Sequence, residues 1–192
     1  QSVKNEIKEL SYDSNDIKGI KVIKNNYNGG YASGINLGIK YIENDNTCSF
    51  IWLINNDVIL DKFSLSALVQ KFKNSDTISI FGSKIYNERT KIIESMGGVI
   101  NRNNLTTRHI TKLDEKVDYI PGASLFFHAN VLNINGLFPE EYFMYYEDVD
   151  WCTRAKKNNI KLIIVANSII YHNNNHEMLI KLKLYSLLNR IR

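Results

Sequence analysis

The sequence predicts an α/β fold, and two observations carry that prediction. Short apolar runs rich in β-branched and aromatic residues alternate along the chain with amphipathic stretches of helical period. The chain of 192 residues has no internal repeat and no low-complexity linker, so a single domain over residues 1–192 is expected. Strands that alternate with helices favour an α/β/α sandwich around a mostly parallel sheet.

The predicted elements follow from those patterns. Strands are expected at residues 20–23, 50–54, 78–86, 125–127 and 162–165, and helices at 3–10, 32–42, 62–72 and 147–157. The segment 95–118 is rich in Gly, Asn, Thr and Arg, and is interpreted as a hairpin or a mobile loop across the ligand-binding face. Ligands in such sheets bind at the carboxyl ends of strands, so motifs that follow a strand carry the most weight.

Composition and charge narrow the class of protein. Apolar residues make up 44% and charged residues 23%, and no apolar run is long enough to span a membrane. The net charge of +4 is mild and its basic residues are scattered, which argues against nucleic acid as a partner and is compatible with an anionic substrate or a nearby acidic membrane. Cys48 and Cys152 lack a CxxC spacing and are expected in the core of a cytoplasmic protein, with a place at the inner face of the membrane left open.

Two segments that end strands contain candidate metal ligands. Asn55-Asn56-Asp57 follows the apolar run FIWLI, which places a carboxylate where Mg²⁺ or Mn²⁺ can bind together with substrate phosphates. The same residues also favour an ordinary turn, and that alternative stays open. His172 ends the apolar run that begins at Ile169. A lone His is more often structural, but a neutral imidazole at a strand end can complete a metal site.

Three acids, Glu147, Asp148 and Asp150, begin a predicted helix directly after an aromatic run that ends at Tyr146. An N-cap, the favourable helix dipole or an ion pair of Asp150 with Arg154 would each explain one of these acids. None of those alternatives requires the aromatic run. Aromatic walls beside a carboxylate suit the recognition of a sugar ring and the removal of a proton from its hydroxyl.

Two glycine-containing segments also follow or precede strands. Pro121-Gly122-Ala123-Ser124 implies a tight bend with accessible backbone, useful where a substrate approaches closely, or else an ordinary turn. The stretch from Asn28 to Gly38 follows a strand and opens a helix, so its amides are placed to meet a phosphate or a base. It has neither the G-x-G-x-x-G spacing of dinucleotide-binding proteins nor the GK(S/T) of a P-loop.

Taken in order, these segments resemble the family 2 glycosyltransferases. The motifs are N-x-G-(F/Y)-A-x-G-x-N-x-G at 28–38, a strand ending in L-N-(N/P/D)-D at 53–57 with one inserted Ile, G-A-(S/A) at 122–124, G-x-F-(D/P)-E-x-(F/Y)-F-x-Y-x-E-D-x-D at 136–150, and a strand ending in Y-H at 171–172. They are most similar to the branch of rhamnosyltransferases and galactofuranosyltransferases of bacterial surface polysaccharides. The resemblance covers nearly the whole chain and implies a GT-A type fold, a nucleotide-binding α/β sandwich.

The resemblance also implies roles for single residues. Asp57 and His172 would bind a divalent cation, Mg or Mn, with Asn55 in the place of the family's first acid, and Asp148 would be the catalytic base. The acceptor would be bound by Glu147, Asp150, Gly122, Ala123 and Tyr146, and the donor nucleotide by Asn28, Gly30, Asn36 and Asn56.

The implied activity is inverting transfer of a sugar from a nucleotide-sugar donor, with a dTDP- or UDP-sugar expected, to a hydroxyl of a glycan or lipid-linked saccharide. Two alternatives stay open: a sugar nucleotidyltransferase, and a non-catalytic module that binds nucleotide-sugars.

The two ends of the chain depart from the family pattern. Family members begin with a strand of type V-x-V-x-I-V-T-(Y/F)-N and a second strand ending in V-D-N-x-S-x-D-x-S, and only Gln1-Ser2-Val3 resembles the end of the second. Roughly 35 to 45 residues are therefore expected to be missing, and donor binding is expected to suffer. A final helix at 177–192, with basic residues beside leucines, is expected to lie on a membrane interface or against a further C-terminal segment.

Overall fold

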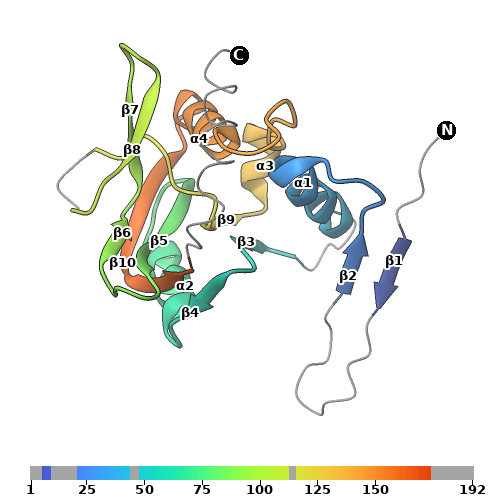
Figure 1. Cartoon of the computed structure of the whole chain (residues 1–192), viewed down its shortest axis with the longest axis horizontal. Helices are drawn as coiled ribbons and strands as arrows, with labels where there is room; N and C mark the ends of the chain where they lie inside the picture. Colours follow the sequence, from blue (N-terminus) through green and yellow to red (C-terminus); the bar gives the residue numbers. More distant parts are fainter. Residues whose placement is uncertain (1–5, 10–20, 44–47, 113–115, 174–192) are drawn as a thin grey trace.

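A six-stranded sheet forms the centre of the molecule (Figure 1). This computed structural model describes residues 6–9, 21–43, 48–112 and 116–173. Five strands lie side by side in the order β3 (Phe50–Ile54), β9 (Ser124–His128), β5 (Ser79–Asn87), β10 (Lys161–His172) and β4 (Val58–Leu60), and β6 (Ile93–Ser95) pairs with β5.

The sheet is mixed, so the prediction of a mostly parallel sheet is wrong. Only β5 and β10 pair in parallel; β9 is antiparallel to both β3 and β5, β4 is antiparallel to β10, and β6 to β5. Parallel neighbours need a crossover of a dozen or more residues, usually a helix. Among the residues described between β5 and β9 there is no helix, and strands make this connection. An apolar run does not itself encode its direction.

The register nevertheless aligns three strand ends. Because β9 is antiparallel to both β3 and β5, those two strands run the same way, and β10 runs with them. The carboxyl ends of β3, β5 and β10 therefore lie at one edge of the sheet. The segment before β9 reaches the same edge, since Ser124 pairs with Ile54.

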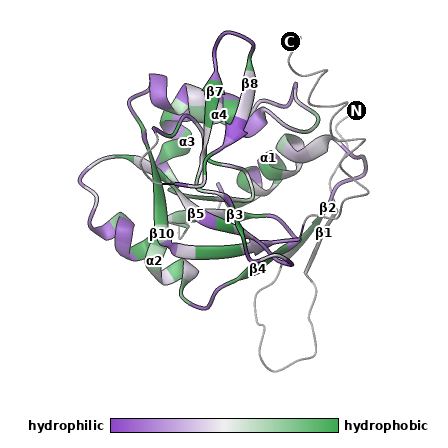
Figure 2. Ribbon diagram, turned by 60° about the vertical axis from the view of Figure 1, so that its left-hand side comes forward, coloured by the Kyte–Doolittle hydropathy of each residue, from purple (hydrophilic) through white to green (hydrophobic). Residues whose placement is uncertain are grey.

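Helices cover both faces of this sheet, which confirms the layered arrangement. Alternate residues of β9 point to opposite faces, as strand geometry requires. Leu125 and Phe127 join the larger core with α1 (Gly30–Ile42), α3 (Asn130–Asn135) and α4 (Glu147–Lys157), while Phe126 joins a smaller core under α2 (Ser64–Lys73). Each fully buried Leu or Phe of this kind contributes about 1.5–3 kcal/mol. Figure 2 shows the apolar stretches along the central strands.

The charge pattern of α4 explains where that helix begins and ends. Its first turn contains three acidic residues and its last turn three basic ones, which complements the helix dipole at both ends. Asn158 follows as the C-cap, and Asn159 has a left-handed φ of 59° that stops the helix. Helix 147–157 is therefore confirmed at its predicted bounds.

Two hairpins stand outside the central sheet. β7 (Gly98–Asn101) and β8 (Thr106–His109) pair antiparallel, which confirms the hairpin interpretation of 95–118, and polar residues occupy the tip (Figure 2). β1 (Glu6–Glu9) pairs with β2 (Lys21–Lys24), so the helix predicted at 3–10 is wrong in its described part. The register pairs residues 6–9 with residues 21–24 along the whole ladder.

The remaining predictions agree with the structure to within a few residues. Strands β2, β3, β5 and β9 and helices α1 and α2 lie where the patterns placed them, although β2 is not part of the central sheet. The runs at 162–165 and 169–172 form one strand, β10, with an irregularity between Val165 and Ile169. Elements β4, β6 and α3 were not predicted, and the expected helix at 177–192 lies outside the described residues.

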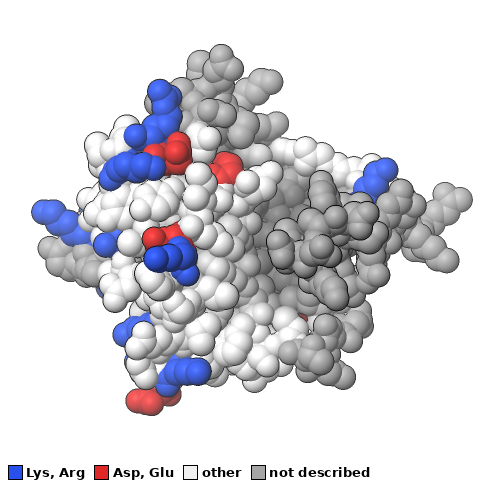
Figure 3. Space-filling view, turned by 90° about the horizontal axis from the view of Figure 1, so that it is seen from below, with Lys and Arg blue, Asp and Glu red and all other residues white. Residues whose placement is uncertain are grey.

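Cys152 is fully buried and Cys48 is partly buried against the same core, and both are free thiols. Within the described part of the chain, no helix is long and apolar enough to cross a bilayer. On the face shown in Figure 3, Lys and Arg side chains are scattered and acidic residues lie among them.

Candidate active site

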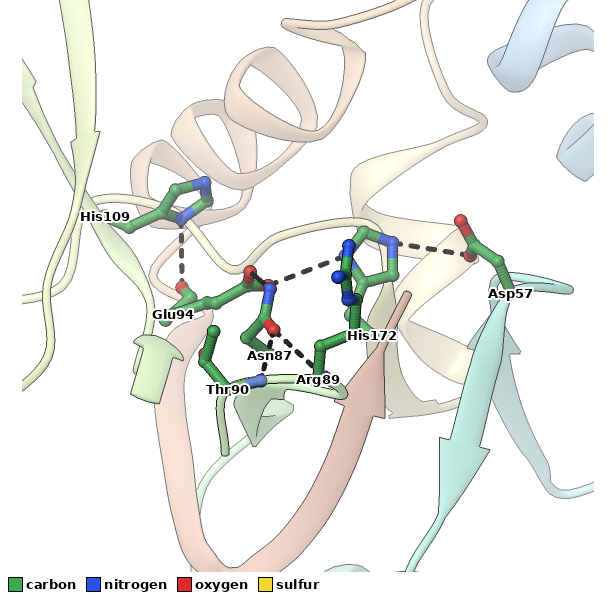
Figure 4. Close-up of polar contacts among 8 residues, drawn as sticks. Asp57, Asn87, Arg89, Thr90, Glu94, His109 and His172 are labelled. Carbon is green, nitrogen blue, oxygen red and sulfur yellow. Dashed lines mark hydrogen bonds and ion pairs between the residues drawn. The ribbon is translucent and has the colours of Figure 1, made fainter. Parts of the chain in front are cut away.

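Asp57 and His172 meet at the shared edge of the sheet (Figure 4). Asp57 lies in the turn between β3 and β4, and His172 ends β10. The imidazole Nε2 is 3.3 Å from Asp57 Oδ1. The pairing of β10 with β4 and a hydrogen bond from the Asn173 amide to the Asp57 carbonyl, 3.1 Å, hold the two backbones together. The structure thus brings together two residues that the sequence separates widely.

Glu94 lies on the other side of the His172 ring. Its Oε2 is 3.8 Å from Nδ1, and its Oε1 accepts a hydrogen bond of 2.7 Å from the Asn87 side chain at the end of β5. A carboxylate behind an imidazole orients the ring and sets which nitrogen faces a ligand. The sequence analysis missed Glu94, whose one signal was an acid after two isoleucines, three residues before the Gly97-Gly98 pair.

These side chains fit a divalent cation of the Mg²⁺ or Mn²⁺ kind. Asp57 and His172 offer one oxygen and one nitrogen at adjacent positions, and Asn55 Oδ1 is buried without a hydrogen-bond partner in the described structure. Among the described residues, no three His, Cys, Asp or Glu side chains gather as a metal site. Such cations usually bind through one or two protein ligands and take their remaining ligands from phosphates and water, so a pair is sufficient.

Asp148 and Glu147 begin α4 with very different surroundings. Asp148 Oδ2 accepts a hydrogen bond from the Gly122 amide, 2.9 Å, and Oδ1 accepts one from the Val149 amide, 2.8 Å. Glu147 is 5% exposed, and its Oε2 has no hydrogen-bond partner in the described part of the chain.

Burial shifts the pKa of both carboxyl groups upward. Burial raises the pKa of Asp148 above its usual range, against the opposing effect of backbone hydrogen bonds from Gly122, Val149 and its own amide. Burial and the neighbouring Asp148 charge raise the pKa of Glu147 from 4.5 to about 8. Two adjacent carboxyl groups that exchange protons at higher pH than usual are typical of acid–base sites.

The chain enters α4 through two strained tyrosines. Tyr145 and Tyr146 have φ angles of 69° and 73°, in the left-handed region that residues other than glycine rarely adopt. Such conformations cost about 1–3 kcal/mol each and cluster at functional sites. The aromatic run is visible in the sequence, but nothing in the sequence indicates its left-handed backbone conformation.

Tyr31, in the first turn of α1, lies between the two groups of acids. Its hydroxyl donates a hydrogen bond of 2.6 Å to the Gly122 carbonyl. Burial, and then the charges of Asp148, Glu147 and Asp57, raise the pKa of this phenol beyond the physiological range. Because Ser124 pairs with Ile54, the Gly122 bend that contacts Tyr31 and Asp148 lies at the same edge of the sheet as the turn that contains Asp57. The sequence analysis did not select Tyr31.

The residues predicted to bind the donor nucleotide differ in their exposure and in their hydrogen bonds. Asn56 is exposed in the turn beside Asp57, and Asn28 Oδ1 accepts a hydrogen bond from the Gly30 amide, 3.1 Å. Asn36 is 1% exposed: its Nδ2 donates to the Phe138 carbonyl, 2.8 Å, and its Oδ1 accepts from the Phe138 amide, 2.9 Å. Asn36 thus holds α1 to the backbone of Phe138, and its contact with a nucleotide stays a prediction.

The residues predicted to bind the acceptor fall into two places. Gly122 contacts Asp148, Ala123 is buried beside it, and Glu147 points into the interior. Asp150 and Tyr146 instead line a cavity of about 320 Å³ together with Tyr142, Thr153, Arg154 and Lys157. Tyr142 donates a hydrogen bond of 3.2 Å to Asp150 Oδ2. Positions two apart on a helix point to nearly opposite sides, so Asp148 and Asp150 do not share one pocket.

Comparison with known proteins supplies a family. The model of the family described as glycosyl transferase family 2 matches residues 3–132, which include Asp57 and Gly122 but neither Asp148 nor His172. The chain is also 27% identical over 149 residues to the low-salt glycan biosynthesis hexosyltransferase Agl10 of Haloferax volcanii. That alignment covers 74% of this chain and 48% of the relative, so the chain spans about half the length of that protein.

Proposed function

The chain belongs to glycosyl transferase family 2, and on this premise we propose that it transfers a sugar from a nucleoside-diphosphate donor to an acceptor hydroxyl. The acceptor is a glycan or a lipid-linked saccharide, and the reaction inverts the anomeric centre. The likeness to a hexosyltransferase named for glycan biosynthesis supports this class of reaction. A dTDP- or UDP-sugar donor, a rhamnosyl- or galactofuranosyl-type product and a role in bacterial surface polysaccharides at the inner face of the membrane are the finer parts of the proposal.

One observation carries the proposal. Asp57 and His172 come together at the edge of the sheet where Gly122 also holds the Asp148 carboxyl. The charges of Asp57 and Asp148 both act on the Tyr31 hydroxyl. Transfer from a nucleotide-sugar needs a cation near the donor diphosphate, held by oxygen and nitrogen ligands of the protein, and a base near the acceptor hydroxyl. This edge offers both on rigid strand and helix ends.

In the proposed reaction, Asp148 takes the proton of the acceptor hydroxyl. The acceptor oxygen forms its bond to the anomeric carbon while the bond from that carbon to the donor diphosphate breaks, and the electron pair leaves with the diphosphate. The transition state has oxocarbenium character, as in glycoside hydrolysis. A divalent cation held by Asp57 and His172 would supply positive charge to the departing diphosphate. The raised pKa of Asp148 makes its carboxylate a better proton acceptor than an exposed aspartate.

The test is product analysis with a panel of nucleotide-sugars in Mg²⁺ and Mn²⁺, read by chromatography of the nucleotides. We expect nucleoside diphosphate to be released from one donor, at a rate that falls at least tenfold when EDTA removes the metal or when Asp57 is changed to Asn. The matched control is Asp76→Asn, an exposed acid in the turn after α2, which should keep the wild-type rate.

Two other outcomes would reject the proposal. Release of pyrophosphate would indicate a nucleotidyltransferase, and binding of a donor without any turnover would indicate a binding module.

A further inference from the structure

Two segments that lie far from Gly122 in the sequence both contact it. The Gly122 carbonyl accepts the hydroxyl hydrogen bond of Tyr31, and the Gly122 amide donates to Asp148 Oδ2. The first distance is 2.6 Å and the second 2.9 Å. The bend before β9 is thus held from both sides, by α1 and by α4.

The absence of a side chain at Gly122 permits this approach. A Cβ there would lie 2.8 Å from the Tyr31 hydroxyl and 2.9 Å from its ring, closer than a carbon atom can approach without displacement. Glycine therefore lets the phenol reach the carbonyl directly. Any larger residue would move either Tyr31 or the amide that faces Asp148.

The start of α1 is itself fixed, so Tyr31 has a defined position. Its amide donates a hydrogen bond of 3.0 Å to the Phe143 carbonyl, in the aromatic segment that leads into α4. Gly30 precedes it with φ of +85°, and a Cβ at Gly30 would collide with the same carbonyl. The helix that presents Tyr31 and the segment that presents Asp148 are consequently locked to each other.

We propose that Tyr31 is a positioning residue, whose hydroxyl fixes the Gly122 bend and thereby holds the Asp148 carboxyl in the orientation needed to accept a proton. The catalytic part of this inference rests on the proposed role of Asp148 as the base. Tyr31 itself exchanges no proton, because its surroundings keep the phenol neutral. In the described part of the chain, the titratable groups that the Asp148 charge affects include Tyr31 from α1, Tyr119 before β9, and Glu147 and Cys152 of α4.

The hydrogen bond from Gly122 favours the ionised form of Asp148, so loosening the bend has a measurable consequence. In Tyr31→Phe, the ring remains but the carbonyl loses its donor. The Asp148 carboxylate then loses part of its amide support and should take up its proton at higher pH. A residue that served only packing would leave that titration unchanged.

The first experiment follows the Gly122 amide by ¹⁵N–¹H NMR of the protein between pH 4 and 9. Wild type should show an inflection that Asp148→Asn removes, and Tyr31→Phe should shift that inflection to higher pH. The control is Tyr27→Phe, which removes a hydroxyl from the same region, where it lies 3.5 Å from Ser33 Oγ, and should leave the inflection unchanged. An inflection in Tyr31→Phe that matches wild type would overturn the inference, and melting curves check that the variant remains folded.

The second experiment measures turnover with the donor found by the nucleotide-sugar panel. Tyr31→Phe should lower kcat about ten- to a hundredfold with little change in the donor KM, and should move the acid limb of the kcat profile to higher pH. A lower kcat without a displaced acid limb would contradict positioning of the base. If Asp148→Asn kept its turnover while the NMR shift was present, the base assignment would fail although the link between Tyr31 and Gly122 stood.

Discussion

At the scale of single residues, the two acids at the start of α4 differ in how their oxygens are satisfied. Both oxygens of Asp148 accept backbone hydrogen bonds, which supports its charge, whereas Glu147 keeps one oxygen buried and unpartnered among the described residues. A buried carboxylate without donors is costly, and a protonated carboxyl is much less so. Glu147 is thus best accommodated as the neutral acid of the pair, while backbone donors support the charge of Asp148.

This difference predicts the pH dependence of stability. The folded-state pKa of Glu147, about 8, lies above its ordinary value of 4.5, so the folded protein holds a proton that the unfolded chain releases. The corresponding stabilisation is complete below pH 4.5 and is lost as pH rises towards 8. Glu147→Gln mimics the protonated form, so its advantage over wild type should grow across that window to a few kcal/mol, as an order-of-magnitude figure.

The measurement is a series of thermal melts from pH 5 to pH 9. The difference in Tm between Glu147→Gln and wild type should be small at pH 5 and positive at pH 9. Glu43→Gln, an exposed acid at the end of α1, serves as the control and should show no such trend. A variant that melts below wild type at every pH would mean that Glu147 is stabilised as a charged group.

At the scale of elements, the short strand β6 has a role beyond its size. It pairs with the end of β5 and thereby places Glu94 behind His172, while β4 places Asp57 in front. His109 of β8 joins the same neighbourhood through a 2.9 Å contact of its Nδ1 with Ser95 Oγ. The His172 imidazole therefore lies between two carboxyl groups, Asp57 in the turn before β4 and Glu94 on β6 (Figure 4).

Changing Glu94 to Gln should weaken metal binding without removing a ligand. Partners of this kind typically contribute 10- to 100-fold in metal affinity, so we expect the Kd for Mn²⁺ to rise by about that factor. Electron paramagnetic resonance of free Mn²⁺ measures it without any substrate. Glu88→Gln changes an acid of the neighbouring turn, whose carboxylate lies 3.8 Å from Lys91 Nζ, and should keep the wild-type affinity. An unchanged Kd in Glu94→Gln would show that the carboxylate does not support His172.

Sequence patterns predicted most elements because apolar periodicity reports burial directly. They predicted Asp57 and His172 as candidates because each follows an apolar strand, and Asp148 because it lies among acids at a helix start after an aromatic run; its role as base came from the family resemblance. They did not predict strand direction, which depends on connections far along the chain. Tyr31 and Glu94 were missed for a related reason: a tyrosine in an apolar helix and a glutamate on an edge strand look ordinary until the fold brings Gly122 and His172 beside them.

Asn36 illustrates the opposite case. Within a glycine-containing segment that opens a helix, an amide side chain is a reasonable candidate for nucleotide contact. In the fold, its donor and acceptor both bind the backbone of Phe138, and its Nδ2 also lies 2.8 Å from Glu140 Oε1. A buried amide of this kind ties α1 to the segment that leads into α4. Asn36 of this motif therefore has a structural role that the residue spacing of the motif did not reveal.

At the scale of the whole molecule, the mixed sheet brings several strand ends to the same edge. Three strands that run the same way, together with the bend before β9 and the first turn of α4, bring the chemistry to one edge. The layers on both faces keep that edge rigid, which a reaction with two substrates and one base requires. The central claim is that this edge is one active site with Asp148 as its base.

The most direct measurement of that claim is the turnover of Asp148→Asn with the preferred donor, alongside donor affinity by calorimetry. The amide keeps the size of the side chain but cannot take a proton. We predict that kcat falls at least about a hundredfold while the donor Kd stays near that of wild type. Turnover close to wild type in a folded Asp148→Asn protein would contradict the assignment of the base and with it the account of this site.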